Sequence, residues 1–131
     1  MLKWMMIVLV GSILIYQFAF SQQGAKAYTN LDPKEAFAKL SDFQVIDVRE
    51  PYEWNDELGH IKEATLIPAG LLSQKMSQLD KNKPILVVCR SGRRSANASQ
   101  ILGSQGYQVF NLNGGMIKWN ASGLGVVRSS N

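Results

Sequence analysis

Four consecutive apolar residues, Ile85-Leu86-Val87-Val88, stand immediately before the only cysteine of the chain, Cys89. The run has no alternation of apolar and polar residues, so the strand that it predicts has no face for solvent. Strands of this kind occur in the middle of parallel sheets, where helices cover both faces. The run therefore predicts an α/β fold and places Cys89 at the carboxyl end of a central strand.

The other segments alternate between strand-like and helix-like patterns, as an α/β fold requires. Further strands are predicted at 45–48, 64–67 and 108–112, and helices at 33–40, 71–79, 95–105 and 114–120. Asp32 is expected to cap the first helix, with Pro33 at its first position and Glu35 closing a capping box. The predicted fold class is α/β, with a mostly parallel sheet flanked by helices on both faces.

The first 27 residues have the layout of a signal peptide. Lys3 precedes an apolar run at 4–20, and no further charge occurs before Lys26. Ala25-Lys26-Ala27 fits the small-x-small cleavage pattern and would leave a mature chain that begins at Tyr28. The resulting expectation is an exported protein, in the periplasm or on the outer side of the cytoplasmic membrane.

An uncleaved membrane anchor through residues 4–20 is the alternative interpretation. As a helix, that run would reach about 25 Å, against a hydrocarbon core of about 30 Å. Polar flanks and bilayer thinning can make up such a difference. We therefore expect residues 1–27 to be a signal peptide or a membrane anchor, with cleavage favoured, and residues 28–131 to form the folded domain.

Charge and composition exclude several function classes. The chain has 14 basic and 10 acidic side chains; leaving out Lys3 and Lys26 gives 12 against 10, a net charge of +2. This balance argues against a nucleic-acid partner, which requires a clustered basic surface. One Cys and one His exclude an intrachain disulfide and argue against a metal site built from these ligands.

The segment after Cys89 has the composition of an anion-binding loop. It reads Arg90-Ser91-Gly92-Arg93-Arg94-Ser95 and connects the buried strand to a predicted helix. Such a loop can turn its backbone N–H groups inward, and the following helix adds its positive end. Gly92 supplies the freedom for a tight turn. Together with the arginines, this setting favours the thiolate of Cys89, which is the nucleophilic form.

Four motifs in register resemble the family of single-domain rhodaneses, over about residues 30–120. One motif is the loop 89–95. The others are Ile46-Asp47-Val48-Arg49-Glu50-Pro51, Gly59-His60-Ile61 with Ala64 and Ile67-Pro68, and Leu112-Asn113-Gly114-Gly115 followed by Trp119.

The resemblance implies a rhodanese-like fold and a sulfurtransferase that needs no cofactor. Cys89 would take sulfane sulfur from a small anionic donor such as thiosulfate, hold it as a persulfide, and pass it to cyanide or a thiol. The N–H groups of residues 90–95 would hold the persulfide, and Arg90, Arg93 and Arg94 would attract the donor.

Other interpretations stay open at this point. A noncatalytic module of the same fold would bind a partner or an anion without using the thiol. A phosphatase or arsenate reductase is disfavoured, because the arginine expected six residues after the cysteine is replaced by Ser95. Asp47, Arg49 and His60 are interpreted as structural supports of the site rather than as reacting groups.

Overall fold

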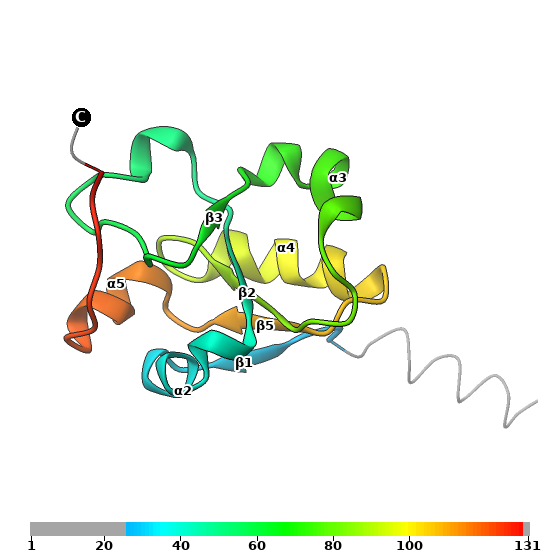
Figure 1. The fold of residues 1–131 in the computed structure, drawn as a ribbon, viewed down its shortest axis with the longest axis horizontal. Helices are drawn as coiled ribbons and strands as arrows, with labels where there is room; N and C mark the ends of the chain where they lie inside the picture. Colours follow the sequence, from blue (N-terminus) through cyan, green and yellow to red (C-terminus); the bar gives the residue numbers. More distant parts are fainter. Residues whose placement is uncertain (1–25, 130–131) are drawn as a thin grey trace, which may run out of the picture.

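The computed structural model describes residues 26–129 (Figure 1). The apolar run at 4–20, which we interpreted as part of a signal peptide or anchor, lies outside the described residues. Within residues 26–129, none of the helices has the length and apolar character needed to cross a membrane.

The centre of the fold is a five-stranded sheet in the order β1-β5-β4-β2-β3. All neighbouring strands pair in parallel. The strands are β1 (Thr29–Leu31), β2 (Gln44–Asp47), β3 (Thr65–Leu66), β4 (Ile85–Val88) and β5 (Val109–Leu112). The strand predicted from the apolar run is thus the central one, and its four residues are buried.

Helices cover both faces of this sheet, which confirms the predicted fold class (Figure 1). The helices are α2 (Pro33–Ala38), α3 (Leu72–Lys75), α4 (Arg93–Ser104) and α5 (Gly115–Ala121). Buried residues of α3 and α4 form one core cluster with the sheet, and those of α2 and α5 form the other. Along β4 the side chains alternate between the two clusters, so Val87 and Cys89 face α4 while Leu86 and Val88 face α2 and α5.

The predicted capping of the first helix is wrong, both for the Asp32 side chain and for the capping box with Glu35. Pro33 does occupy the first turn, but the side chain of Asp32 makes no capping hydrogen bond. Its Oδ1 atom accepts hydrogen bonds from Asn113 Nδ2 and Lys118 Nζ, both at 3.0 Å. The donors that follow β5 therefore compete successfully with the helix N-terminus for this carboxylate. A capping box occurs instead at Glu50 and Glu53.

Several boundaries also differ from the prediction. β1 was not predicted, because its three residues carry no apolar pattern; it forms by pairing with β5. The helix expected at 71–79 is α3 between two 3-10 turns, Ala69–Leu71 and Met76–Gln78. The helix predicted at 33–40 ends at Ala38.

Candidate active site

Cys89 lies where the sheet topology creates a natural binding site. It follows β4, and the chain continues through α4 to β5 on one side of β4, while β2 on the other side leads on to β3. At such a point the connections diverge in opposite directions, and the carboxyl ends of the two strands border a crevice. The loop 89–92 follows β4 at this edge, and Asp47 and Arg49 follow from the end of β2.

The sulfur of Cys89 is enclosed and hydrogen-bonded. The residue is fully buried, at 0% exposure. Gly92 N donates a hydrogen bond to Sγ at 3.1 Å, and Ser95 Oγ lies 3.2 Å from Sγ. α4 begins at Arg93, so its positive N-terminal end adjoins the sulfur. The Gly92 N–H and the helix end direct partial positive charge at the sulfur, and the Ser95 hydroxyl lies within hydrogen-bonding distance of it.

Gly92 has a backbone conformation that few other residues adopt. Its φ is +96°, in the left-handed region. A Cβ atom at this position would lie 3.0 Å from Gly114 N. Its carbonyl accepts a hydrogen bond from Asn111 Nδ2 at 3.2 Å, from the buried end of β5. Asn111 therefore holds the peptide group on one side of Gly92 while the N–H on the other side reaches the sulfur.

The start of α5 holds the loop from its outer side. Met116 N donates to Cys89 O at 2.9 Å, and Ile117 N donates to Arg90 O at 3.0 Å. A Cβ on Gly115 would lie 2.5 Å from both of these carbonyl oxygens, so only glycine permits this approach. Because trans peptides place C=O and N–H on opposite sides, the N–H groups of Arg90 and Ser91 point away from α5. We call residues 89–95, with Asn111 and 114–117, the sulfur cradle.

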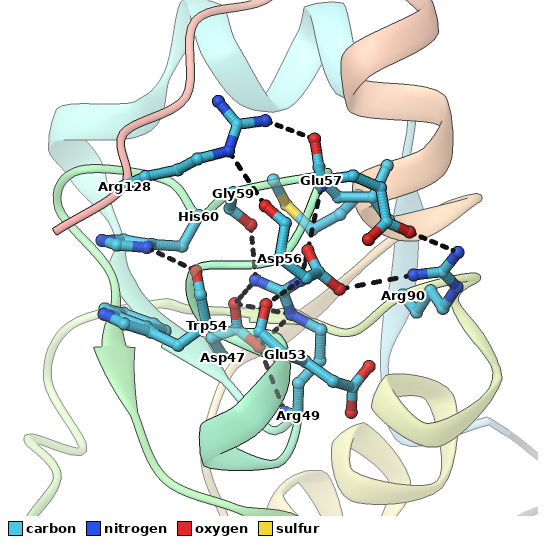
Figure 2. A network of polar contacts seen from close by, with 12 residues as sticks. Asp47, Arg49, Glu53, Trp54, Asp56, Glu57, Gly59, His60, Arg90 and Arg128 are labelled. Atoms are coloured by element: carbon cyan, nitrogen blue, oxygen red, sulfur yellow. Dashed lines mark hydrogen bonds and ion pairs between the residues drawn. The ribbon is translucent and has the colours of Figure 1, made fainter. Parts of the chain in front are cut away.

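A second loop, residues 50–60, borders the cradle and is anchored by Arg49 (Figure 2). The guanidinium of Arg49 is fully buried and pairs with Asp47 at 2.8 Å. It also donates to the carbonyl oxygens of Gly59 at 2.7 Å and Glu53 at 3.3 Å. One buried cation thus holds both ends of the loop. We call residues 50–60 the carboxylate rim.

The rim engages two of the three arginines predicted to attract a donor. Arg94 forms a forked pair with Glu53, at 2.6 and 2.8 Å. This pairing lowers the pKa of Glu53 to about 2, and the carboxylate raises the pKa of Arg94. Arg90 pairs with Asp56 and Glu57 (Figure 2), at distances of 3.4 and 3.1 Å. Both guanidinium groups therefore face carboxylates of the same protein.

Arg93 differs from its two neighbours. It is exposed at the first position of α4, and it forms no ion pair with any residue in the range 26–129. Of the three arginines grouped together in the sequence, only this one presents an uncompensated charge to solvent.

His60 lies in the rim and outside the cradle. Its ring stacks on Trp54, with centroids 3.6 Å apart, and its Nδ1 is 2.8 Å from Trp54 O. The backbone of His60 forms an antiparallel bridge with Val127 near the C-terminus. Arg128 also donates to the carbonyl oxygens of Asp56 and Glu57 (Figure 2). These contacts hold the rim loop, and none of them reaches the sulfur.

Comparisons with known proteins agree with this geometry. The family model of the rhodanese-like domain matches residues 32–122. A sulfurtransferase of Allochromatium vinosum is 37% identical over 94 residues, covering 71% of this chain and 86% of that protein. The uncharacterized protein YqhL of Bacillus subtilis is 32% identical over 120 residues, 91% of this chain and 94% of that protein.

A solved structure with similar coverage is the homodimeric polysulfide-sulfur transferase of Wolinella succinogenes. It is 31% identical, has a TM-score of 0.69, and the match covers 92% of this chain and 94% of that one. The fold and the cysteine loop define a rhodanese-type α/β protein. This chain belongs to the rhodanese-like domain family, and its relatives support sulfur transfer as its general activity.

Sequence reasoning missed most of the residues that support the loop. Asn111 contacts Gly92, which is 19 residues away in sequence, and Glu53 contacts Arg94, which is 41 residues away. The Asp56-Glu57 pair in an otherwise uncharged stretch from Trp54 to Ile61 was one available signal, because unlike charges in neighbouring loops tend to pair. No comparable signal marked Asn111, since an amide at a strand end is common in any sheet.

Proposed function

We propose that this protein is a sulfurtransferase that carries sulfane sulfur as a persulfide on Cys89. The observation that carries this proposal is the position of Sγ at the carboxyl end of β4, within 3.1 Å of Gly92 N and 3.2 Å of Ser95 Oγ. A buried thiol in an apolar core would not need donors directed at its sulfur. A thiolate or a persulfide anion gains from both.

The reaction takes place in two displacements. The thiolate of Cys89 attacks the outer sulfur of a donor such as thiosulfate, the donor's S–S bond breaks, and sulfite leaves with the bonding electrons. A thiophilic acceptor, cyanide or a thiol, then attacks the outer sulfur of the persulfide and restores the thiolate. The cradle holds the same negative charge before and after each step, so little reorganisation is needed.

A phosphatase reaction has less support from the site. The sixth residue after Cys89 is Ser95, whose hydroxyl contacts the sulfur itself. Arg94 is the nearest arginine that could bind a phosphoryl group, but both of its terminal nitrogens already bind the carboxylate of Glu53. A phosphate would therefore lack an arginine free to donate two parallel hydrogen bonds to its oxygens.

Incubation of the purified protein with a sulfane sulfur donor tests the proposal. The expected result is the added mass of one sulfur atom on the peptide that contains Cys89, and its removal by cyanide as thiocyanate. Cys89→Ser should remain folded and lose both steps, because a hydroxyl fills the space but holds no sulfane sulfur. Turnover by the Ser variant, or no sulfur gained by the parent, would contradict the proposal and favour a binding module.

We also propose export, which rests on the basic, apolar and small-residue pattern of residues 1–27. N-terminal sequencing of the protein from its host should begin at or near Tyr28. Retention of Met1 in the membrane fraction would indicate an anchor instead, and retention of Met1 in a cytoplasmic product would contradict export.

A further inference from the structure

The charges of the cradle and the rim, taken with those of Asp47, Arg49 and Arg128 that hold the rim, cancel. The cations are Arg49, Arg90, Arg93, Arg94 and Arg128, and the carboxylates are Asp47, Glu50, Glu53, Asp56 and Glu57. Five positive charges thus stand against five negative ones, and most of them are joined in ion pairs or hydrogen bonds (Figure 2). The cluster of arginines next to Cys89 in the sequence does not produce a strongly positive site in the folded protein.

The neutralisation is built into the structure. Glu53 is 5% exposed, receives a fork from Arg94, and in turn accepts a hydrogen bond from Glu50 N at 3.1 Å. Asp56 accepts a bond from Leu58 N at 2.9 Å, which directs its carboxylate toward Arg90. A donor that approaches Cys89 therefore meets arginines whose charge is already compensated, except for Arg93.

We infer that the site selects a sulfane sulfur donor that carries at most one negative charge, such as the hydropersulfide of a small thiol, over dianionic thiosulfate. The inference rests on the proposed function, since it concerns the donor of the same Cys89. Coulomb energy scales with the product of the charges, so the thiolate of Cys89 repels a dianion twice as strongly as a monoanion. A nearly neutral surrounding does not offset that repulsion, whereas a donor with little charge does not experience it.

The transfer from a hydropersulfide balances without a further reagent. The thiolate of Cys89 forms a bond to the terminal sulfur of R–S–SH, and the donor's S–S bond breaks. R–S⁻ leaves with the bonding pair and takes up the proton of the terminal sulfur through solvent. The Cys89 persulfide anion remains in the cradle, next to Gly92 N and Ser95 Oγ.

The test compares two donors and two variants in the full chain. The donors are thiosulfate and the hydropersulfide of 2-mercaptoethanol, and the readout is the rate at which Cys89 gains sulfur, by rapid quenching and mass spectrometry. Asp56→Asn with Glu57→Gln removes two rim charges and keeps an oxygen for the Leu58 N–H. Glu35→Gln with Glu63→Gln is the matched control, since both of these side chains are exposed and neither forms an ion pair within residues 26–129.

In the parent, loading from thiosulfate should rise slightly with ionic strength, because salt screens the repulsion between the Cys89 thiolate and a dianion. The rim variant should raise the ratio of thiosulfate to hydropersulfide loading roughly three- to tenfold, and its thiosulfate loading should fall as salt is added. The control variant should leave the ratio unchanged. A lowered melting temperature of the rim variant would show that Asp56→Asn impairs folding. In that case Glu57→Gln alone should still change the ratio in the same direction, because the Glu57 side chain is 69% exposed and its replacement should not affect folding.

Two outcomes would overturn the inference. One is thiosulfate loading of the parent that falls steeply with added salt, and the other is a rim variant with the ratio of the parent. If neither donor loads Cys89, the proposed function fails. Loading by both donors with an unchanged ratio contradicts only the donor class.

Discussion

The sulfur cradle and the carboxylate rim lie side by side, yet they are held by different forces. In the cradle, backbone N–H groups of α5 and the amide of Asn111 bind the carbonyl oxygens of Cys89, Arg90 and Gly92. The carboxylates of the rim instead form ion pairs with the side chains of Arg90 and Arg94, and several of these groups are half-exposed. The cradle therefore determines where the sulfur lies, and the rim determines which charges a donor meets.

This difference has a physical consequence for each region. Buried hydrogen bonds between neutral groups are insensitive to salt and require close approach of backbone to backbone, which is why glycine occurs there. Exposed ion pairs contribute little stability and respond to salt and to substitution. Two pairs depart from that pattern: the fully buried pair of Asp47 and Arg49, which anchors the rim, and the pair of Glu53 with Arg94, in which the carboxylate is buried.

The largest expected effect tests the pair of Asp47 and Arg49. Arg49→Leu leaves the fully buried carboxylate of Asp47 without its cation and should lower the free energy of unfolding by about 3–5 kcal/mol. The double variant with Asp47→Asn removes both charges and should recover a large part of that loss. Urea denaturation measures both variants. A loss below about 1 kcal/mol for the single variant would contradict the anchoring role of the pair and show that it contributes no more than an exposed ion pair.

A smaller effect is expected from Gly115→Ala in the cradle. Its φ of +59° costs an L-residue about 1–2 kcal/mol, and the new Cβ would lie 2.5 Å from Cys89 O and Arg90 O. We expect a loss of about 2–4 kcal/mol and slower sulfur loading of Cys89.

Gly123→Ala is the matched control for Gly115→Ala. Gly123 has a similar φ of +74°, but no atom lies within 4 Å of the new Cβ. This control should cost about 1 kcal/mol and leave sulfur loading unchanged. Equal losses in the two variants would show that backbone conformation alone matters and that α5 does not hold the loop.

The smallest effect concerns the pH dependence of the rim. The pKa of Glu53 is about 2 in the folded protein, against 4.5 for an unperturbed carboxyl. A lowered pKa stabilises the fold above pH 4.5, and this contribution is lost as the pH falls toward 2. Because Arg94 is partly exposed, we expect about 1–2 kcal/mol. Unfolding of the parent and of Glu53→Gln, measured from pH 7 to 2.5, should differ at neutral pH and converge at low pH. A constant difference would contradict the pairing.

Local patterns were sufficient to predict much of the architecture. The buried run of β4 indicated a parallel sheet with two covered faces, and the structure has both. Features that depend on contacts with residues distant in sequence were predicted less well. β1 exists because β5 pairs with it, and the Asp32 side chain does not cap its helix because Asn113 and Lys118 donate hydrogen bonds to it.

The sequence by itself determined the class of the protein and the position of the cysteine that we propose as its nucleophile. A buried strand that ends in Cys89, followed by a Gly- and Arg-rich loop, specifies local structure and chemistry within a dozen residues. Only the tertiary structure decided the electrostatics of the site. Coulomb interactions depend on distances through space, and the carboxylates that compensate Arg90 and Arg94 lie 33 to 41 residues away along the chain. Three similar arginines in sequence thereby become two paired side chains and a single exposed one, Arg93.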